Sequence, residues 1–397
     1  MNKKFTFDVL INIVASALPI AILQVVILPE IAKFDGSRYG LILTLISVLS
    51  IGPLMMGNSL NNIRLIRNEI YNNYNIEGDF NPILFVLIII SILSIAIADI
   101  FYENNYSFLN IILLSILAVL MLFREYYIVA FRLKINYYDI FKCNFLQVVG
   151  FIIGIFIYKA YHYWEIVYIS GYGLSVIFLF ERSNLWKEKL SITKLFKATA
   201  KEQIYLMSAN FLNRFIDYAD KMILFPLLGS SAVSVYYVAV CSTKIILMVI
   251  SPLNSVILTY LSKWTSIKFD VVKRALNISG FISIIIYFVC AFLSKPILNI
   301  LYPQYVAEAM NYIYITAAVT AIYSIISVID PFIIRFFDMK WQFIMSISTV
   351  CFYLCICLYF LDRYGLYGFC LGVLITNIFK LICRLLVYYY STRYKYI

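Results

Sequence analysis

Runs of about 20 consecutive apolar residues recur from one end of the chain to the other, and they constrain its fold more than any other feature. A helix of that length crosses a bilayer core about 30 Å thick, because it rises about 1.5 Å per residue. The runs are continuously apolar and do not alternate as barrel strands do, so helices are favoured. Only 13% of the 397 residues are charged, whereas water-soluble domains carry about 25%. The sequence therefore predicts an all-α polytopic membrane protein.

Twelve spans are predicted, and a basic loop at about 181–205 separates the first six from the last six. This division predicts two six-helix lobes, 1–200 (including the loop) and 201–397, around a central cavity, with a weak repeat between their first hairpins. The spans lie near 8–28, 39–60, 82–101, 108–130, 140–158, 166–180, 206–228, 232–261, 276–294, 308–334, 343–361 and 367–389.

Lys and Arg residues concentrate in the segments that share a side with the N-terminus. By the positive-inside rule, both termini are predicted to be cytoplasmic. This asymmetry also explains the net charge of +11 without nucleic acid as a partner. The longest loops, about 61–81 and about 181–205, are predicted to be cytoplasmic. The outer loops are short, which argues against an enzyme with an extracellular active site, and no P-loop is present.

Six polar residues of the seventh span recur at spacings that place them on one helix face. A charge at mid-bilayer costs a few kcal/mol even on lenient scales, so this face is expected to meet protein or water. Cavity lining is the favoured interpretation; the alternative is a structural ion-pair network of Arg214 with Asp217 and Lys221. The six residues are Asn210, Asn213, Arg214, Asp217, Asp220 and Lys221.

Other charges fall inside predicted spans. Lys244 lies near the middle of the eighth span, where it either lines a cavity or pairs with the seventh. Arg124 and Glu125 lie in the inner half of the fourth span, with interface snorkelling or function as alternatives. Lys380 and Arg384 are expected to snorkel, and Asp330 to mark a helix end. These deeper charges sum to a positive interior, which favours an anionic substrate such as a phosphate or pyrophosphate.

No catalytic residue, metal site or cofactor is predicted. All eight cysteines fall inside predicted spans, so no disulfide framework is implied. No histidine or carboxylate stands near enough to Cys351, Cys355 and Cys357 to complete a metal site.

The run from Asn213 to Leu224, followed by Leu228–Val233, Tyr236 and Ala239, resembles the start of the second lobe in Wzx-type polysaccharide flippases. These belong to the multidrug/oligosaccharidyl-lipid/polysaccharide exporter superfamily. The first-lobe turn with Tyr39-Gly40-Leu41 is similar to the corresponding element of that family. Ser234 stands where the family often has glycine, and the chain is short for it. The resemblance implies a MATE-like fold and leaves the cargo open.

The resemblance implies a flippase that moves a polyprenyl-pyrophosphate-linked oligosaccharide to the outer leaflet of the bacterial inner membrane by alternating access. The cargo would serve O-antigen or capsule synthesis. Arg214, Lys221 and Lys244 would attract the pyrophosphate in a cavity that Asn210 and Asn213 also line. Asp217 and Asp220 would tune these cations or carry a coupling H+ or Na+. Partners would be membrane lipids and other polysaccharide-assembly membrane proteins.

Three alternatives stay open. The first is a drug or metabolite exporter of the same superfamily, for which a more acidic cavity is expected. The second is a membrane-embedded enzyme of envelope assembly, to which the short outer loops offer little. The third is a structural assembly partner, whose function would survive charge reversal in the seventh span.

Overall fold

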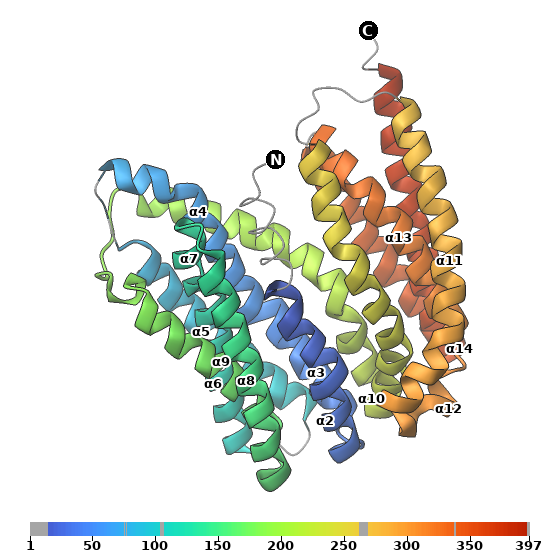
Figure 1. The fold of residues 1–397 in the computed structure, drawn as a ribbon, viewed down its shortest axis with the longest axis horizontal. Coiled ribbons are helices and arrows are strands. Elements are labelled where there is room, and N and C mark those ends of the chain that lie inside the picture. The colour runs from blue at the N-terminus through green and yellow to red at the C-terminus, as the bar shows by residue number, and fades with distance from the viewer. Residues whose placement is uncertain are drawn as a thin grey trace. The chain divides into compact units, whose positions relative to one another are not determined.

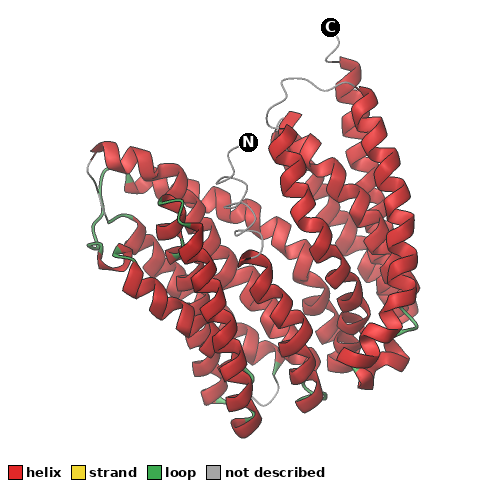
Figure 2. Cartoon of the chain, viewed as in Figure 1, coloured by secondary structure: helices red, strands yellow, loops and turns green. Residues whose placement is uncertain are grey.

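A computed structural model of the chain describes residues 15–74, 76, 78–103, 107–261, 269–336 and 339–394. Regular structure within these ranges is helical, with no strand (Figure 2). By its internal packing the chain divides into two compact units, Met1–Ser230 and Ser231–Ile397. The boundary therefore falls at Ser230, whereas the lobe boundary predicted from the sequence lies at residue 200. The polar part of the seventh span is packed with the first unit.

Among its described residues, the first unit contains five candidate membrane spans, the helix α9 and the part of α10 that precedes the turn at Gly229 (Figure 1). The chain is helical over Ala15–Phe34, of which η1 and α2 form the second part. The elements are η1 Leu23–Ile27, α2 Leu28–Phe34, α3 Tyr39–Leu49, η2 Ser50–Leu54, α4 Met55–Tyr74, α5 Phe80–Tyr102, α6 Phe108–Tyr127, α7 Val129–Leu133, α8 Tyr137–Tyr161, α9 Glu165–Arg182, η3 Leu185–Lys187 and the first part of α10 Phe196–Leu261.

The second unit contains the rest of α10 and four further α-helices with one short 3₁₀ turn. Two glycines with positive φ interrupt the long helices α10 and α14, Gly229 at +83° in α10 and Gly365 at +57° in α14. These left-handed conformations favour glycine because it has no Cβ. Both lie at turns predicted between spans. The further elements are α11 Phe269–Leu301, η4 Pro303–Tyr305, α12 Val306–Ala309, α13 Ile313–Phe336 and α14 Met339–Tyr394.

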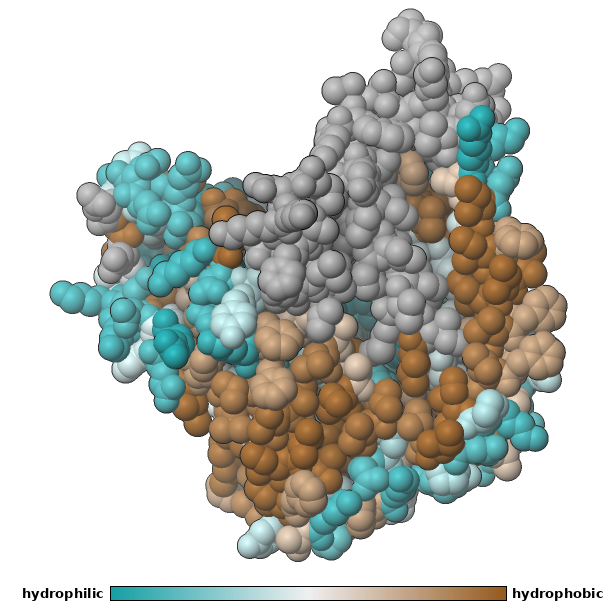
Figure 3. Space-filling view, viewed as in Figure 1, coloured by the Kyte–Doolittle hydropathy of each residue, from teal (hydrophilic) through white to brown (hydrophobic). Residues whose placement is uncertain are grey.

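Nine helices in the described ranges are long and apolar enough to cross a membrane, with α10 and α14 each counted across its glycine turn. On the face drawn in Figure 3, apolar side chains cover the middle of the helices and hydrophilic ones gather at their ends. Exposed Phe85, Leu93 and Ile97 on α5 belong to this apolar surface. Large exposed apolar area of this kind fits lipid as the solvent. The predicted all-α polytopic membrane protein is confirmed.

One predicted loop is wrong in large part. The segment 61–81 is helical as far as Tyr74, because α3, η2 and α4 form one continuous helix of 36 residues from Tyr39. Pro53 lies in η2, a π-helical turn, which accommodates a proline that cannot donate a backbone hydrogen bond. The second predicted loop, 181–205, is also shorter, since α10 begins at Phe196.

Close helix contacts position the interior of the first unit. A Cβ on Gly57 of α4 would lie 2.6 Å from the carbonyl oxygen of Leu122 in α6. A Cβ on Gly154 of α8 would lie 2.6 Å from the Cα of Val167 in α9. Glycine is therefore required where these backbones approach each other. The result is a tightly packed frame into which α6 and α8 project polar side chains.

Candidate functional site

The polar face of α10 is joined to α4 through Asn210. Its side-chain Nδ2 donates to Oγ of Ser59 at 2.9 Å, and the Ser59 hydroxyl donates in turn to the Met55 carbonyl oxygen at 2.9 Å. Asn210 is half-buried and Ser59 is fully buried. This predicted cavity residue therefore has a structural role in docking α10 on the first unit.

Lys221 and Asp220 form a buried ion pair between sequence neighbours. Lys221 Nζ lies 2.9 Å from Asp220 Oδ1, and the two side chains are only 4% and 10% exposed. The Lys221 backbone N–H donates to the same oxygen at 2.8 Å. The Lys221 ammonium also lies 5.6 Å from the centroid of the Tyr218 ring. Much of the positive charge of Lys221 is thus compensated within the protein, so it is less available to an anion than the sequence predicts.

Arg214 differs from Lys221 in its ion pairing. It is half-buried and forms no ion pair with another residue in the described part of the chain. The ion pair that the structure gives on this face joins Lys221 to Asp220, and the network of Arg214 with Asp217 and Lys221 stays a prediction. Asp217 is exposed, and the side chain of Asn213 lies outside the described residues. Of the face's two cations, Lys221 lies at ion-pair distance from a carboxylate, and Arg214 has no such ion pair among the described residues.

Lys244 lies in the second unit and is half-buried. Its ammonium is 5.8 Å from the centroid of the Tyr237 ring, a cation–π distance. A ring face stabilises the cation without neutralising its charge. The anion-attracting role of Lys244 stays a prediction.

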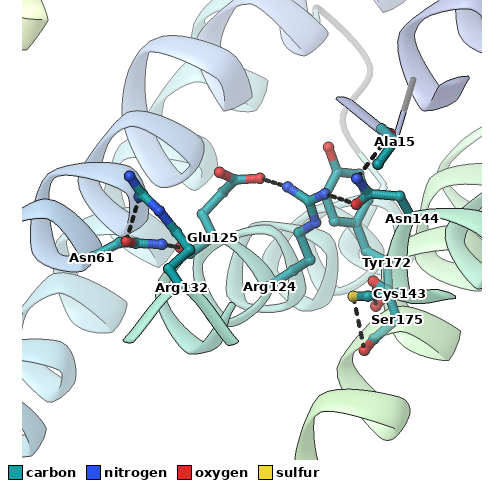
Figure 4. Close-up of polar contacts among 9 residues, drawn as sticks. All are labelled: Ala15, Asn61, Arg124, Glu125, Arg132, Cys143, Asn144, Tyr172 and Ser175. Carbon is teal, nitrogen blue, oxygen red and sulfur yellow. Dashed lines mark hydrogen bonds and ion pairs between the residues drawn. The ribbon is translucent and has the colours of Figure 1, made fainter. Parts of the chain in front are cut away.

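Arg124 and Glu125 belong to a buried polar network in the first unit (Figure 4). Arg124 forms an ion pair with Glu125 and donates to Asn144 Oδ1. Asn144 Nδ2 donates to the Ala15 carbonyl oxygen at 2.9 Å. Glu125 is 8% exposed and Asn144 3% exposed. These contacts point inward, so interface snorkelling does not describe this pair.

The network continues towards α4. Asn61 Nδ2 donates to the Glu125 carbonyl oxygen at 2.8 Å, and Asn61 Oδ1 accepts from Arg132 at 2.6 Å (Figure 4). Two polar atoms in this region have no hydrogen-bond partner in the described part of the chain, Nε of Arg124 and Oε1 of Gln147. An unpaired donor and an unpaired acceptor make this network a second candidate polar site, after the α10 face.

Two expectations for the second unit are corrected. Asp330 does not end its helix, because α13 continues to Phe336. Arg384, expected to snorkel, forms an ion pair with Asp330, in which Arg384 NH2 lies 3.3 Å from Oδ2. The Lys380 ammonium lies 5.6 Å from the Tyr323 ring centroid. These side chains have partners inside the unit, which local hydropathy does not reveal.

The sequence analysis did not predict several polar side chains that have defined hydrogen-bond partners in the structure. Arg64 of α4 contacts both carboxylate oxygens of Glu188, in the segment that joins α9 to α10. Asp79 accepts from the Thr193 backbone N–H at 2.7 Å and from the Tyr71 hydroxyl at 2.7 Å. In the sequence, these residues only form part of polar runs assigned to loops. Such runs do not indicate which residues pair with each other.

Asp99 and Glu165 are also absent from the predicted set. Asp99 lies in the last turn of α5 and Glu165 is the first residue of α9, and both are buried. The sequence could have identified Asp99 as a candidate, because it is an acidic residue within a predicted span. No group of three or more metal-ligating side chains occurs among the described residues.

No family model and no curated protein matches this chain. The chain is similar to the solved structure of the lipid II flippase MurJ in an inward closed conformation, with a TM-score of 0.69. The identity is 15%, over 96% of this chain and 86% of that one. The chain therefore shares the fold of that structure.

Two further solved structures have a similar fold. One is an inward-facing multidrug resistance MATE family transporter of the MOP superfamily, with a TM-score of 0.63 and 13% identity over 94% of this chain and 93% of that one. Another is a MATE structure in the bent conformation, with a TM-score of 0.62 and 11% identity over 96% and 92%. The shared feature is the fold along nearly the whole chain, which confirms the expected MATE-like architecture and a multi-pass membrane protein.

Proposed function

We propose that this protein is a flippase that moves a polyprenyl-pyrophosphate-linked oligosaccharide from the inner to the outer leaflet of a bacterial cytoplasmic membrane. The two units would alternate between conformations open to either side, and the cargo would feed synthesis of a surface polysaccharide. The observation that carries the proposal is the similarity to a lipid II flippase over 96% of the chain. No covalent chemistry is required of the protein.

The physical need for such a protein is clear. A saccharide headgroup cannot cross hydrocarbon unaided, because its hydroxyl groups would lose their hydrogen bonds at a cost of several kcal/mol each. A protein that shelters the headgroup removes this cost while the polyprenyl chain stays in the bilayer.

The charges support an anionic group in the cargo. Arg214 keeps an uncompensated guanidinium and Lys244 an ammonium that faces an aromatic ring. Guanidinium binds phosphate oxygens through two parallel hydrogen bonds, so Arg214 is the favoured pyrophosphate ligand. Lys221 has a smaller role than first predicted, since Asp220 compensates it. Asp217 stays the candidate that tunes Arg214, and Asn213 stays a candidate cavity residue.

A drug or metabolite exporter is the second candidate, because MATE structures match over a similar share of the chain. The flippase and the exporter differ in the charge of the cargo that each prefers. An exporter of organic cations needs carboxylates without compensating cations on its polar face, whereas Asp220 is held by Lys221. This contact favours the flippase.

The test uses a deletion strain of the host, in which lipid-linked oligosaccharide and surface polysaccharide are both quantified. We expect complete lipid-linked units to accumulate and surface polymer to be lost. The wild-type gene should restore normal amounts of lipid-linked units and of surface polymer. Arg214→Ala should not restore them, at a protein abundance equal to that of wild type. Lys197→Ala is the matched control, since it removes an exposed positive charge from the same helix. Normal lipid intermediates and normal polymer in the deletion strain would reject the flippase and direct the work to export assays.

A further inference from the structure

Two buried carboxylates in the first unit have oxygen atoms that no described residue satisfies at hydrogen-bond distance. Asp99 of α5 is 0% exposed and Glu165 of α9 is 2% exposed. Both carboxylate oxygens of Asp99, and Oε2 of Glu165, have no hydrogen-bond partner in the described part of the chain. Buried polar atoms are hydrogen-bonded in the great majority of cases, so each exception needs an explanation.

The groups that face these carboxylates come from neighbouring elements. Asp99 interacts electrostatically with Glu103 and Arg38, and Glu165 interacts with Arg38, Asp99 and Glu103. Arg38 precedes α3, and Glu103 follows α5. The charged neighbours of the two buried carboxylates are therefore a third carboxylate, that of Glu103, and one guanidinium, that of Arg38.

The neighbouring polar side chains are already paired. Tyr158 of α8, which also faces Glu165, donates from its hydroxyl to Asp35 Oδ2 at 2.5 Å. Asn110 Nδ2 donates to Glu103 Oε2 at 3.4 Å. Neither contact supplies a positive charge to Asp99 or Glu165.

The single guanidinium does not balance the cluster. Arg38 is in an ion pair with Glu103, and 49% of its side chain is exposed to solvent. Its charge is therefore used by the most accessible of the three carboxylates. An isolated ionised carboxylate in an apolar interior is so costly that the group takes up a proton instead. A metal ion would need a group of ligands, and the described residues contain no such group of three.

The contrast with Asp220 is informative. Asp220 is also buried, but Lys221 Nζ lies 2.9 Å from it and compensates its charge. The coupling ion predicted for Asp217 and Asp220 therefore has a better candidate elsewhere in the same unit. The argument depends on burial and charge and not on the cargo.

We propose that Asp99 and Glu165 form a proton-binding site at the end of the first unit that carries the 35–38 turn. The proton comes from water and binds a carboxylate oxygen, which removes an uncompensated negative charge from the interior. Loss of the proton restores that charge and favours a conformation in which water reaches α5 and α9. Protonation at this site thus stabilises the packing in which both carboxyl groups are buried.

The test is infrared spectroscopy of the purified full-length protein in lipid nanodiscs, titrated with acid and base. Protonated carboxyl groups have a C=O band that ionised carboxylates lack. We expect this band at mildly acidic pH, where exposed carboxylates with pKa values of about 4 are ionised. Asp99→Asn and Glu165→Gln should each remove part of the band, and the double variant should remove most of it.

Glu30→Gln is the matched control and should leave the band unchanged, because Lys33 and Lys159 compensate Glu30. An unchanged band in the double variant would overturn the proposal. Loss of the wild-type band on adding Na+ at fixed pH would also overturn it, because it would identify a sodium site. The readout requires no transport, so its failure is distinguishable from failure of the proposed flippase function.

A second measurement covers variants that do not fold. Dicyclohexylcarbodiimide reacts with protonated carboxyl groups in apolar surroundings, and adducts can be located by mass spectrometry on the wild-type protein. We expect an adduct on Asp99 or Glu165 and none on Glu30. Absence of label at both residues would reject the site.

Discussion

The Lys221 ammonium lies 2.9 Å from the carboxylate of Asp220, its neighbour in sequence, and the pair is buried in the first unit. Adjacent residues on a helix do not face each other as residues three or four apart do. The long lysine side chain reaches back to its neighbour all the same. This contact divides the polar face of α10 into a compensated pair and the uncompensated Arg214.

Removing one member of the Asp220–Lys221 pair is expected to destabilise the protein more than removing both. Lys221→Met leaves a buried carboxylate without its cation, a change that costs about 3–5 kcal/mol. Asp220→Asn leaves the cation alone and should cost a similar amount. The double variant should lose much less than the sum. Denaturant unfolding of the four proteins in one detergent measures the coupling. Additive losses would show that the pair is not coupled.

The segment between α9 and α10 is expected to detach when the Arg64–Glu188 contact is weakened. Arg64→Lys keeps the charge but loses the two-pronged contact with both carboxylate oxygens. A hydrogen bond to a charged group contributes about 1.5–3 kcal/mol, so local opening should rise about tenfold or more. Limited trypsin digestion at Lys187 and Lys189 measures this opening. Arg182→Lys, at an exposed position, is the control. Equal cleavage rates in all three proteins would contradict the prediction.

Acid is expected to weaken the contact between α4 and the start of α10. Arg67 hydrogen-bonds to the Glu202 carboxylate and lowers its pKa from the ordinary value of 4.5. A lowered pKa in the folded state contributes stability above that ordinary value, and this is lost as pH falls through the folded pKa. The contribution is below about 1 kcal/mol, because an exposed ion pair is screened by solvent.

Unfolding curves from pH 7 to pH 3 test this prediction. The stability difference between wild type and Glu202→Gln should shrink towards zero at the acid end. Glu181→Gln, which changes an exposed glutamate, should show no such trend. A difference that is constant over the whole pH range would refute the role of the Glu202 carboxylate.

Alanine is expected to have opposite effects at two helical glycines. At Gly154 the added Cβ would lie 2.6 Å from the Cα of Val167, so α8 and α9 must move apart. Overpacking of this kind costs about 1–3 kcal/mol. At Gly280 no atom lies within 4 Å of the added Cβ. There alanine should stabilise α11 by up to about 1 kcal/mol, because it restricts the unfolded chain. Thermal unfolding of both variants checks the two signs, and a loss at Gly280 would be inconsistent with open space there.

Length and hydropathy alone predicted the membrane fold, since the need to satisfy backbone hydrogen bonds in lipid makes each long apolar run a helix. The turns at Gly229 and Gly365 followed from the same pattern. The residues of α4 beyond 60 were misassigned to a loop, because hydropathy detects where a helix leaves the lipid and not where it ends. Periodicity also placed the six polar residues of the seventh span on one face.

Only the tertiary structure decided which charges are compensated. Spacing along one helix suggested a network of Arg214 with Asp217 and Lys221, and only the structure shows that Lys221 pairs with Asp220. Asp99 lies within a predicted span, but its burial and its unpaired oxygens depend on how the helices of the first unit pack. Hydropathy and periodicity are local properties of the chain. Burial and charge compensation depend on helices far apart in sequence, and these are the properties that determine whether a membrane charge holds the fold together or binds a ligand.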